Sequence, residues 1–308
     1  MSEFDKFEIA VIIPCLNEET TIRSVVTGFK AILPEATVYV YDNGSTDATI
    51  KFAGDAGAIV REVSTRGKGN VVKAMFRDVD ADYYIIIDGD DTYPVASAVN
   101  MLSFAVENKT DMVVGSRIKT YKDSKSRRGH YLGNRLLTSF VNYLFKANYS
   151  DLLSGYRVMS RRFVKSAPLF AGGFEVESIL SVHAAEVDAK VIEFPIQYLP
   201  RKDESSSKLN TLQDGFFIVI KIIDLFKDNR PKLFFGSAAV VFFLAGLLVG
   251  LPVISEFVST HYVSRIPSAI LATGLMIFSA ISITAGVIIG AVSKARREIK
   301  KLAFLSLK

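Results

Sequence analysis

The sequence predicts an α/β domain with a Rossmann-like, mostly parallel sheet, followed by a hairpin of two transmembrane helices. From residue 8 to residue 88, short β-branched and aromatic runs alternate with helical segments, which is typical of βαβ units. Beyond Pro231 come two stretches without a charged residue, 233–251 and 266–292. Each is long enough to cross about 30 Å of hydrocarbon. A buried helical hairpin of a soluble protein is the alternative.

The composition of the chain limits the kinds of molecule that it is expected to bind. The chain has 308 residues, a net charge of +5, a pI near 9.1 and an apolar share of 49%. Such a basic chain suits nucleic acid, anionic lipid or a phosphorylated substrate. The apolar C-terminal part favours lipid, so no nucleic-acid partner is expected. The single cysteine, Cys15, excludes an internal disulfide, and residues 1–8 lack the regions of a signal peptide.

The predicted elements follow one another in a regular order. The first strand covers residues 9–13, and Asn17 to Thr20 supplies a cap and an acidic first turn for a helix that ends near Lys30. The next elements are a strand at 38–41, a helix at 48–56, a strand at 58–63 and a helix at 69–79. They lead into a fourth strand that begins at residue 83.

This fourth strand has the most informative ending. It stops at Asp88, Asp90 and Asp91, before Pro94 closes the segment. Carboxylates at positions i and i+2 on an extended tip can turn toward one hard cation. Mg²⁺ or Mn²⁺ held in this way completes its shell with water and substrate phosphates. A solvated acidic turn is the alternative, because Asp and Gly are ordinary turn residues.

Polar residues follow three of the predicted strands. Ligands of an α/β sheet bind outside the carboxyl ends of its strands, so these side chains should gather along one edge. They are Asn17, Glu18, Asp42, Asp47, Asp88 and Asp90. Lys68 lies in a loop that opens a helix, where backbone N–H groups can approach a phosphate. Without Walker spacing, this loop is equally well a flexible helix entry.

Several segments resemble a known family. Residues 12–19, Asp42-Asn43-Gly44-Ser45-Thr46-Asp47 and Asp88-Gly89-Asp90 resemble the nucleotide-sugar half of family 2 glycosyltransferases, which have the GT-A fold. Asp151-Leu152-Leu153-Ser154-Gly155-Tyr156-Arg157, 173–177 and 201–208 are similar to the polyprenyl-phosphate branch, best known from dolichol-phosphate mannose synthases. The resemblance covers about residues 7–230. Thr92 departs from it, because those synthases usually have Gln there, so a UDP-hexose is as plausible a donor as GDP-mannose.

The resemblance implies a role for each matching residue. A nucleotide sugar would be bound by Pro14, Asn17, Glu18, Asp42 and Asp88, and the loop described above adds Lys68 to this set. Asp88 and Asp90 would face the metal, with Asp90 the direct ligand, and Asp47 would support the donor loop. Arg117 would meet the acceptor phosphate, and Arg201 would close on the donor diphosphate. The implied catalytic residues are therefore Asp90, Arg117 and Arg201. For each residue, ordering of a loop is the alternative role.

A basic segment precedes a predicted apolar helix at 136–145. Arg127, Arg128 and Arg135 are its candidates for binding the acceptor phosphate. An apolar helix behind a basic loop is typical of an element at a membrane surface. A core helix beside a solvated loop is the alternative. His130 has no His or Cys nearby, so a histidine metal site is not expected.

The remaining sequence predicts how the chain meets the bilayer. The predicted organisation is a GT-A domain at 1–210, amphipathic juxtamembrane helices at 211–231, two spans within 232–293 and a basic tail at 294–308. Lys and Arg flank the outer ends of both spans, which predicts that the catalytic domain and the C-terminus are cytoplasmic. Gly246, Gly250, Gly286 and Gly290 could pack against a second copy in a homo-oligomer.

These features together predict an inverting, membrane-bound transferase. It would move a hexose from a nucleotide diphosphate sugar to a polyprenyl phosphate. One alternative is a processive polysaccharide synthase, but such enzymes usually carry a Gln-x-x-Arg-Trp motif and more spans, and this chain has no Trp. The other is a membrane-tethered binding protein for a nucleotide sugar or lipid phosphate that has lost catalysis.

Overall fold

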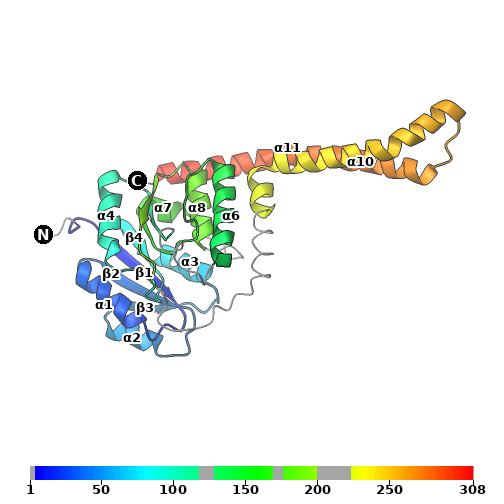
Figure 1. Cartoon of the computed structure of the whole chain (residues 1–308). Coiled ribbons are helices and arrows are strands. Elements are labelled where there is room, and N and C mark those ends of the chain that lie inside the picture. The colour runs from blue at the N-terminus through cyan, green and yellow to red at the C-terminus, as the bar shows by residue number, and fades with distance from the viewer. Residues whose placement is uncertain (1–3, 118–127, 169–175, 200–222, 308) are drawn as a thin grey trace. The chain divides into compact units, whose positions relative to one another are not determined.

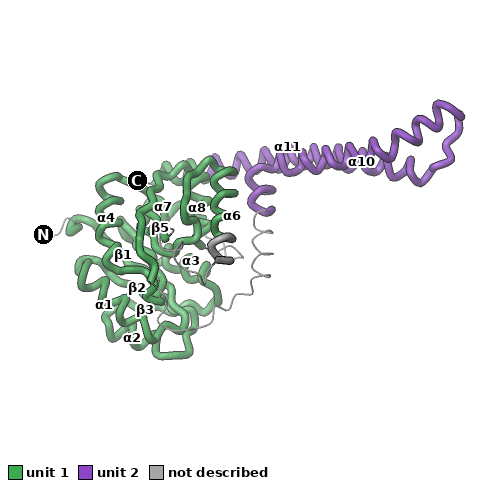
Figure 2. The backbone as a smooth tube through the Cα atoms, viewed as in Figure 1, with its two compact units in different colours: residues 1–215, 300–308 green, residues 216–299 purple. Residues whose placement is uncertain are grey.

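The computed structural model describes residues 4–117, 128–168, 176–199 and 223–307 (Figure 1). The chain divides into two units, coloured separately in Figure 2. The first comprises residues 1–215 and 300–308, and the second comprises residues 216–299. The predicted boundary near residue 210 is close to this division. The end of the predicted basic tail, however, belongs to the first unit.

The described part of the first unit contains a seven-stranded sheet with the order β3-β2-β1-β4-β6-β5-β7. The strands are β1 (Ile9–Cys15), β2 (Thr37–Asp42), β3 (Ile59–Glu62), β4 (Tyr83–Ile86), β5 (Met112–Ser116), β6 (Arg157–Ser160) and β7 (Val191–Pro195). Among them, β6 alone runs antiparallel to its neighbours, β4 and β5. The prediction of a mostly parallel sheet is therefore confirmed.

Helices cover both faces of the sheet because its strands alternate their apolar side chains between two cores. Ile9, Val11 and Ile13 of β1 pack with helices α1 (Ile22–Ile32), α2 (Thr49–Asp55) and α4 (Ser97–Asn108). Ala10 and Ile12 pack with α3 (Lys68–Asp78), α7 (Arg161–Ser166) and α8 (Val176–Glu186). A further helix, α6 (Arg128–Phe145), contacts α8.

The expected start of the first helix is wrong. Helix α1 begins at Ile22, with Thr21 at its N-cap and no acidic residue in its first turn. Glu18 and Glu19 instead belong to a loop that bonds to the residues around Asp47. Tertiary hydrogen bonds therefore outweigh the local capping preference of this segment.

The second unit contains α10 (Pro231–Thr260) and most of α11 (Ile266–Ser306). Both helices are long and apolar enough to cross a membrane, and both extend beyond the predicted spans. The four glycines that could pack against a second copy lie within this hairpin. A Cβ atom on Gly246 would lie 3.4 Å from the carbonyl oxygen of Ala272, and one on Gly286 would lie 3.1 Å from Cβ of Phe235. Small residues therefore serve close helix packing inside one chain.

Candidate active site

The candidate site lies along the edge where β1, β2, β4 and β5 end. Because β6 is antiparallel, its N-terminal end lies at the same edge, and the loop 151–156 leads into it. The predicted convergence of Asn17, Asp42 and Asp88 therefore follows from the topology. Pro14 is placed there too, since it pairs with Tyr41 near the end of β2.

The loop after β2 is built around Asp42. Its Oδ2 atom accepts hydrogen bonds of 2.8 Å from the backbone N–H groups of Gly44 and Ser45. Asn17, with a φ of 57°, accepts a 2.9 Å bond from the N–H of Thr46 and donates its own N–H to Oγ of Ser45. Asp42 is fully buried, so its visible role is to shape this loop. A direct contact with a nucleotide stays a prediction.

Asp47 supports the same loop, as expected. Its Oδ1 atom accepts a 3.0 Å hydrogen bond from the N–H of Thr49, and Oδ2 accepts one of 3.2 Å from the N–H of Glu19. Burial raises the pKa of Asp47, but these hydrogen bonds outweigh it and leave the pKa below its usual range. The N–H of Glu18 donates to Oγ1 of Thr49 at 2.8 Å. The loops after β1 and β2 are thereby joined into one support.

Lys68 opens α3 and points to two carboxylates. Its Nζ atom lies 2.6 Å from Oδ1 of Asp88 and 2.7 Å from Oε1 of Glu177. Desolvation lowers the pKa of Lys68, whereas both carboxylates raise it, and the net pKa is well above the usual range. The lysine therefore stays charged. Its contact with a donor phosphate stays a prediction.

Asn43 holds the loop that presents Lys68. Its amide Nδ2 donates to the carbonyl oxygens of Val63 and Thr65, at 3.0 and 2.9 Å. Its Oδ1 accepts a 2.6 Å hydrogen bond from the N–H of Gly67, whose φ is 115°. That left-handed conformation favours glycine. Gly67 therefore allows the backbone turn that places Lys68 at the start of α3.

The acidic tip after β4 offers oxygen donors to a cation. Asp90 is 7% exposed, and its Oδ1 accepts a 2.6 Å hydrogen bond from Oγ1 of Thr92. Thr92 therefore orients the carboxylate that the sequence predicts as the direct metal ligand. Gly89 is required between the two carboxylates, because a Cβ there would lie 2.7 Å from Sγ of Cys15. Two carboxylates with hard oxygen atoms fit Mg²⁺ or Mn²⁺.

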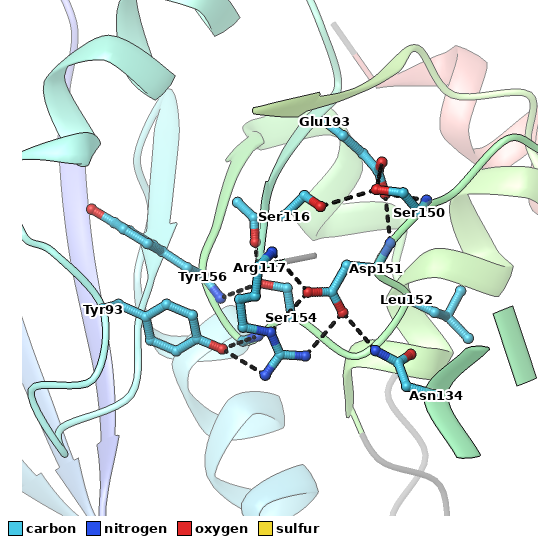
Figure 3. A network of polar contacts seen from close by, with 12 residues as sticks. Tyr93, Ser116, Arg117, Asn134, Ser150, Asp151, Leu152, Ser154, Tyr156 and Glu193 are labelled. Atoms are coloured by element: carbon cyan, nitrogen blue, oxygen red, sulfur yellow. Dashed lines mark hydrogen bonds and ion pairs between the residues drawn. The ribbon is translucent and has the colours of Figure 1, made fainter. Parts of the chain in front are cut away.

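Arg117, just beyond β5, lies in a buried polar network (Figure 3). Its Nε and Nη2 atoms donate to the two carboxylate oxygens of Asp151, at 2.8 and 2.9 Å, and its backbone N–H donates to Oδ2 at 3.0 Å. Asn134 of α6 donates to the same carboxylate at 2.9 Å. Burial raises the pKa of Asp151, but the hydrogen bonds and charge of Arg117 hold it below its usual range. These hydrogen bonds fix the orientation of the Arg117 guanidinium relative to Asp151.

Tyr93 and Gly155 join this network to the acidic tip. The hydroxyl oxygen of Tyr93 accepts hydrogen bonds from Nη1 of Arg117, at 3.3 Å, and from the N–H of Gly155, at 3.0 Å. A Cβ on Gly155 would lie 2.6 Å from Oδ2 of Asp88. The absence of a side chain at this glycine therefore allows Asp88 and Arg117 to belong to one site.

The structure describes only some of the arginines predicted to bind a phosphate. Arg127 and Arg201 lie outside the described residues. Arg128 is the first residue of α6, so the helix predicted at 136–145 begins eight residues earlier than expected. Arg135 is exposed on the same helix. Their contacts with an acceptor phosphate stay predictions.

Three residues of the site were not assigned a role from sequence. Asp151 stands in a motif that carried the resemblance, but it pairs with a residue 34 positions earlier. Glu177 is 109 positions from Lys68, and Tyr93 is part of the segment that closes the acidic strand. The motifs marked these stretches, whereas the pairings depend on the strand order of the sheet.

Comparison with known proteins agrees with this geometry. Residues 10–166 match the family described as glycosyl transferase family 2. Glycosyltransferase AglJ of Haloferax volcanii is 31% identical over 269 residues, which are 87% of this chain and 88% of that protein. A dolichyl-phosphate hexose transferase of the same organism is 27% identical over 76% of this chain and all of its own length.

The fold has solved counterparts as well. Glucosyl-3-phosphoglycerate synthase of Mycobacterium tuberculosis, crystallised with Mn²⁺, UDP and glucosyl-3-phosphoglycerate, superposes with a TM-score of 0.59 at 23% identity. The superposition covers 73% of this chain and 80% of that one, and it supports the GT-A fold alone. The family match covers half of the chain, and AglJ is similar over most of its length. This chain belongs to glycosyl transferase family 2 and is a glycosyltransferase.

Proposed function

We propose that this glycosyltransferase moves a hexose from a nucleotide diphosphate sugar to the phosphate of a polyprenyl phosphate at a membrane surface. The names of its relatives support a lipid-phosphate acceptor, since one of them is a dolichyl-phosphate hexose transferase. The two apolar helices support a membrane location. UDP in the structural neighbour supports a nucleotide-sugar donor.

One observation carries this proposal. The hydroxyl of Tyr93 bonds both to Arg117 and to Gly155, and Gly155 packs directly against Asp88. Tyr93 and Gly155 therefore link the carboxylate that we assign to the metal and diphosphate with the arginine that we assign to the acceptor phosphate. Transfer between two phosphorylated substrates is accelerated when one site holds both in a fixed orientation.

The donor side consists of the loops after β1, β2 and β4. Pro14, Asn17, Glu18 and Asp42 line or shape the nucleotide pocket, and Lys68 adds positive charge beside the acidic tip. Asp88 and Asp90 would hold Mg²⁺ or Mn²⁺, which supplies positive charge against the developing charge of the leaving diphosphate.

The acceptor side needs no general base. A phosphate monoester has a second pKa near 6, so its oxygen is already largely an anion at neutral pH. This oxygen attacks the anomeric carbon of the donor sugar, a new carbon–oxygen bond forms, and the bond to the nucleoside diphosphate breaks. Arg117 and Arg135 orient the attacking anion. A single in-line displacement inverts the anomeric configuration, and a retained configuration in the NMR spectrum of the product would exclude it.

The charges around the hairpin support a topology. Lys227, Arg230 and Lys232 precede the apolar part of α10, and five basic residues follow that of α11: Lys294, Arg296, Arg297, Lys300 and Lys301. Positive charge at both outer ends favours a cytoplasmic location for the C-terminus and for the first unit. We call the first unit the catalytic unit, because it contains the candidate active site.

The test is transfer of labelled sugar into an organic phase. Purified protein in detergent receives polyprenyl phosphate, Mg²⁺ or Mn²⁺, and each of a panel of UDP- and GDP-sugars in turn. Asp90→Asn should abolish the metal-dependent transfer. Asp91→Asn is the matched control, because Asp91 has a φ of 55° and Asn tolerates that conformation. If the protein binds a nucleotide sugar but transfers none to polyprenyl phosphate, the acceptor assignment is wrong. Equal activity of both variants would contradict the metal assignment.

A further inference from the structure

The C-terminal end of α11 belongs to the catalytic unit. Residues 300–308 group with residues 1–215 (Figure 2). Phe304 is 4% exposed and is part of the core cluster that contains residues of α3, α7 and α8. Leu302 and Leu305, near it in sequence, are 68% and 62% exposed. Phe304 is therefore an apolar anchor, whereas Leu302 and Leu305 are not covered by the protein.

Charged groups next to this anchor are complementary. Lys300 pairs with Glu186 at the end of α8, whose side chain is 3% exposed. The Nζ atom of Lys301 lies 2.5 Å from Oδ2 of Asp188, in the turn that follows α8. A carboxylate this deeply buried requires a partner of opposite charge. Among the described residues, Glu186 finds that partner 114 positions further along the chain.

Helix α7 supplies a third contact to the C-terminal end of α11, after the apolar contact of Phe304 and the ion pairs of Lys300 and Lys301. The guanidinium carbon of Arg162 lies 4.9 Å from the centre of the Phe304 ring. Asp111 fixes this guanidinium, because its carboxylate accepts hydrogen bonds of 2.5 and 3.0 Å from Nε and Nη2. Residues far from the C-terminus therefore preform the site that receives the aromatic ring.

We propose that residues 300–306 are a docking segment that attaches the end of the membrane hairpin to the catalytic unit, in addition to the chain connection that precedes α10. Basic residues that follow a membrane span ordinarily face anionic lipid headgroups. Lys300 and Lys301 instead pair with carboxylates of the catalytic unit. Docking requires the C-terminus and the catalytic unit to lie on the same side of the membrane.

The docking segment holds a helix that also serves the active site. Helix α8 has 11 residues, with Glu177 in its first turn and Glu186 at its end. Glu177 bonds to Lys68, which in turn bonds to Asp88. Docking therefore restrains the helix that positions the acidic tip. The structural part of this inference is independent of the reaction, whereas its effect on turnover rests on the proposed function.

Cross-linking in native membranes tests the docking directly. The single cysteine, Cys15, is buried, so cysteines introduced in pairs report without background. Asp188→Cys with Lys301→Cys should react with a short bismaleimide, and mass spectrometry should find the linked peptide within one chain. Asp55→Cys with Lys301→Cys is the control, because Asp55 lies in α2, on the opposite face of the sheet. Equal yields from the two pairs, or no link from either, would overturn the docking.

Substitutions then test what stabilises the docked state. Adding Phe304→Asp to the cross-linking pair should abolish the link and lower sugar transfer, while Leu305→Asp should change neither. Lys300→Glu and Glu186→Lys should each weaken the link, and their combination should restore it, since the exchange keeps opposite charges together. Loss of the link in the Leu305→Asp variant as well would refute the anchor. A cross-linked enzyme that transfers no sugar would refute the proposed reaction and leave the docking standing.

Discussion

The buried ion pair between Arg117 and Asp151 allows a quantitative prediction. Asp151→Ala removes a fully buried carboxylate that accepts three hydrogen bonds from Arg117 and one from Asn134. Removal of one partner of a buried pair costs about 3–5 kcal/mol, because the other charge is left uncompensated. For a unit of about this size, each kcal/mol lowers the melting temperature by about 2–4 °C. The expected decrease is therefore about 6–20 °C.

The assay is thermal unfolding in detergent, followed by the near-ultraviolet circular dichroism of the 12 tyrosines. Asp80→Ala is the matched control, because Asp80 also accepts two hydrogen bonds from one arginine, both of 2.9 Å. That pair is exposed, with 46% of the Arg161 side chain and 61% of the Asp80 side chain in solvent. Exposed pairs contribute about 0–1 kcal/mol, so its melting temperature should fall by a few degrees at most. Similar decreases in the two variants would refute the burial argument.

Three further predictions concern the acidic tip, a glycine and a histidine. Thr92→Val removes the 2.6 Å hydrogen bond to Asp90. The metal concentration that gives half-maximal sugar transfer should therefore rise roughly ten- to hundredfold. Thr92→Ser keeps the hydroxyl and should leave this concentration unchanged. Gly155→Ala places a Cβ 2.6 Å from a carboxylate oxygen of Asp88, so sugar transfer should fall while the circular dichroism spectrum stays unchanged. Gly54→Ala should leave sugar transfer unchanged, because open space surrounds that glycine. Burial, assisted by the charge of a lysine, lowers the pKa of His183 to about 4. Denaturant unfolding at several pH values should therefore show full stability above pH 6.5 and a loss of roughly 3 kcal/mol by about pH 4, which a His183→Gln variant should lack.

Local patterns predicted the first half of the catalytic unit well. The strands and helices from residue 9 to residue 88 agree with the structure within a few residues, because apolar periodicity and turn residues determine them. The edge of the sheet that carries Asp88 and Asp90 followed from the rule for parallel sheets. These inferences depend only on neighbouring residues and a general rule of topology.

Contacts between distant segments could not be predicted in this way. The antiparallel insertion of β6 brings Asp151 to Arg117, and no periodic pattern encodes that strand order. The pairing of Glu177 with Lys68 depends on the packing of α8 against α3. The residues 294–308 were predicted only as a basic cytoplasmic tail, and nothing in their composition indicated that Phe304 and Lys300 find partners on a folded surface.

The strand order also separates the two halves of the site along the gene. The strands β3-β2-β1-β4 come from residues 9–86, and β6-β5-β7 come from residues 112–195, with α4 as the bridge between them. A recombination point within α4 would exchange the proposed acceptor half and leave the proposed donor half intact. Gly155 and Glu177 are among the residues that such a hybrid must retain, because they contact Asp88 and Lys68 across the junction. The residues proposed to bind the acceptor would then be exchanged as one contiguous segment of the chain.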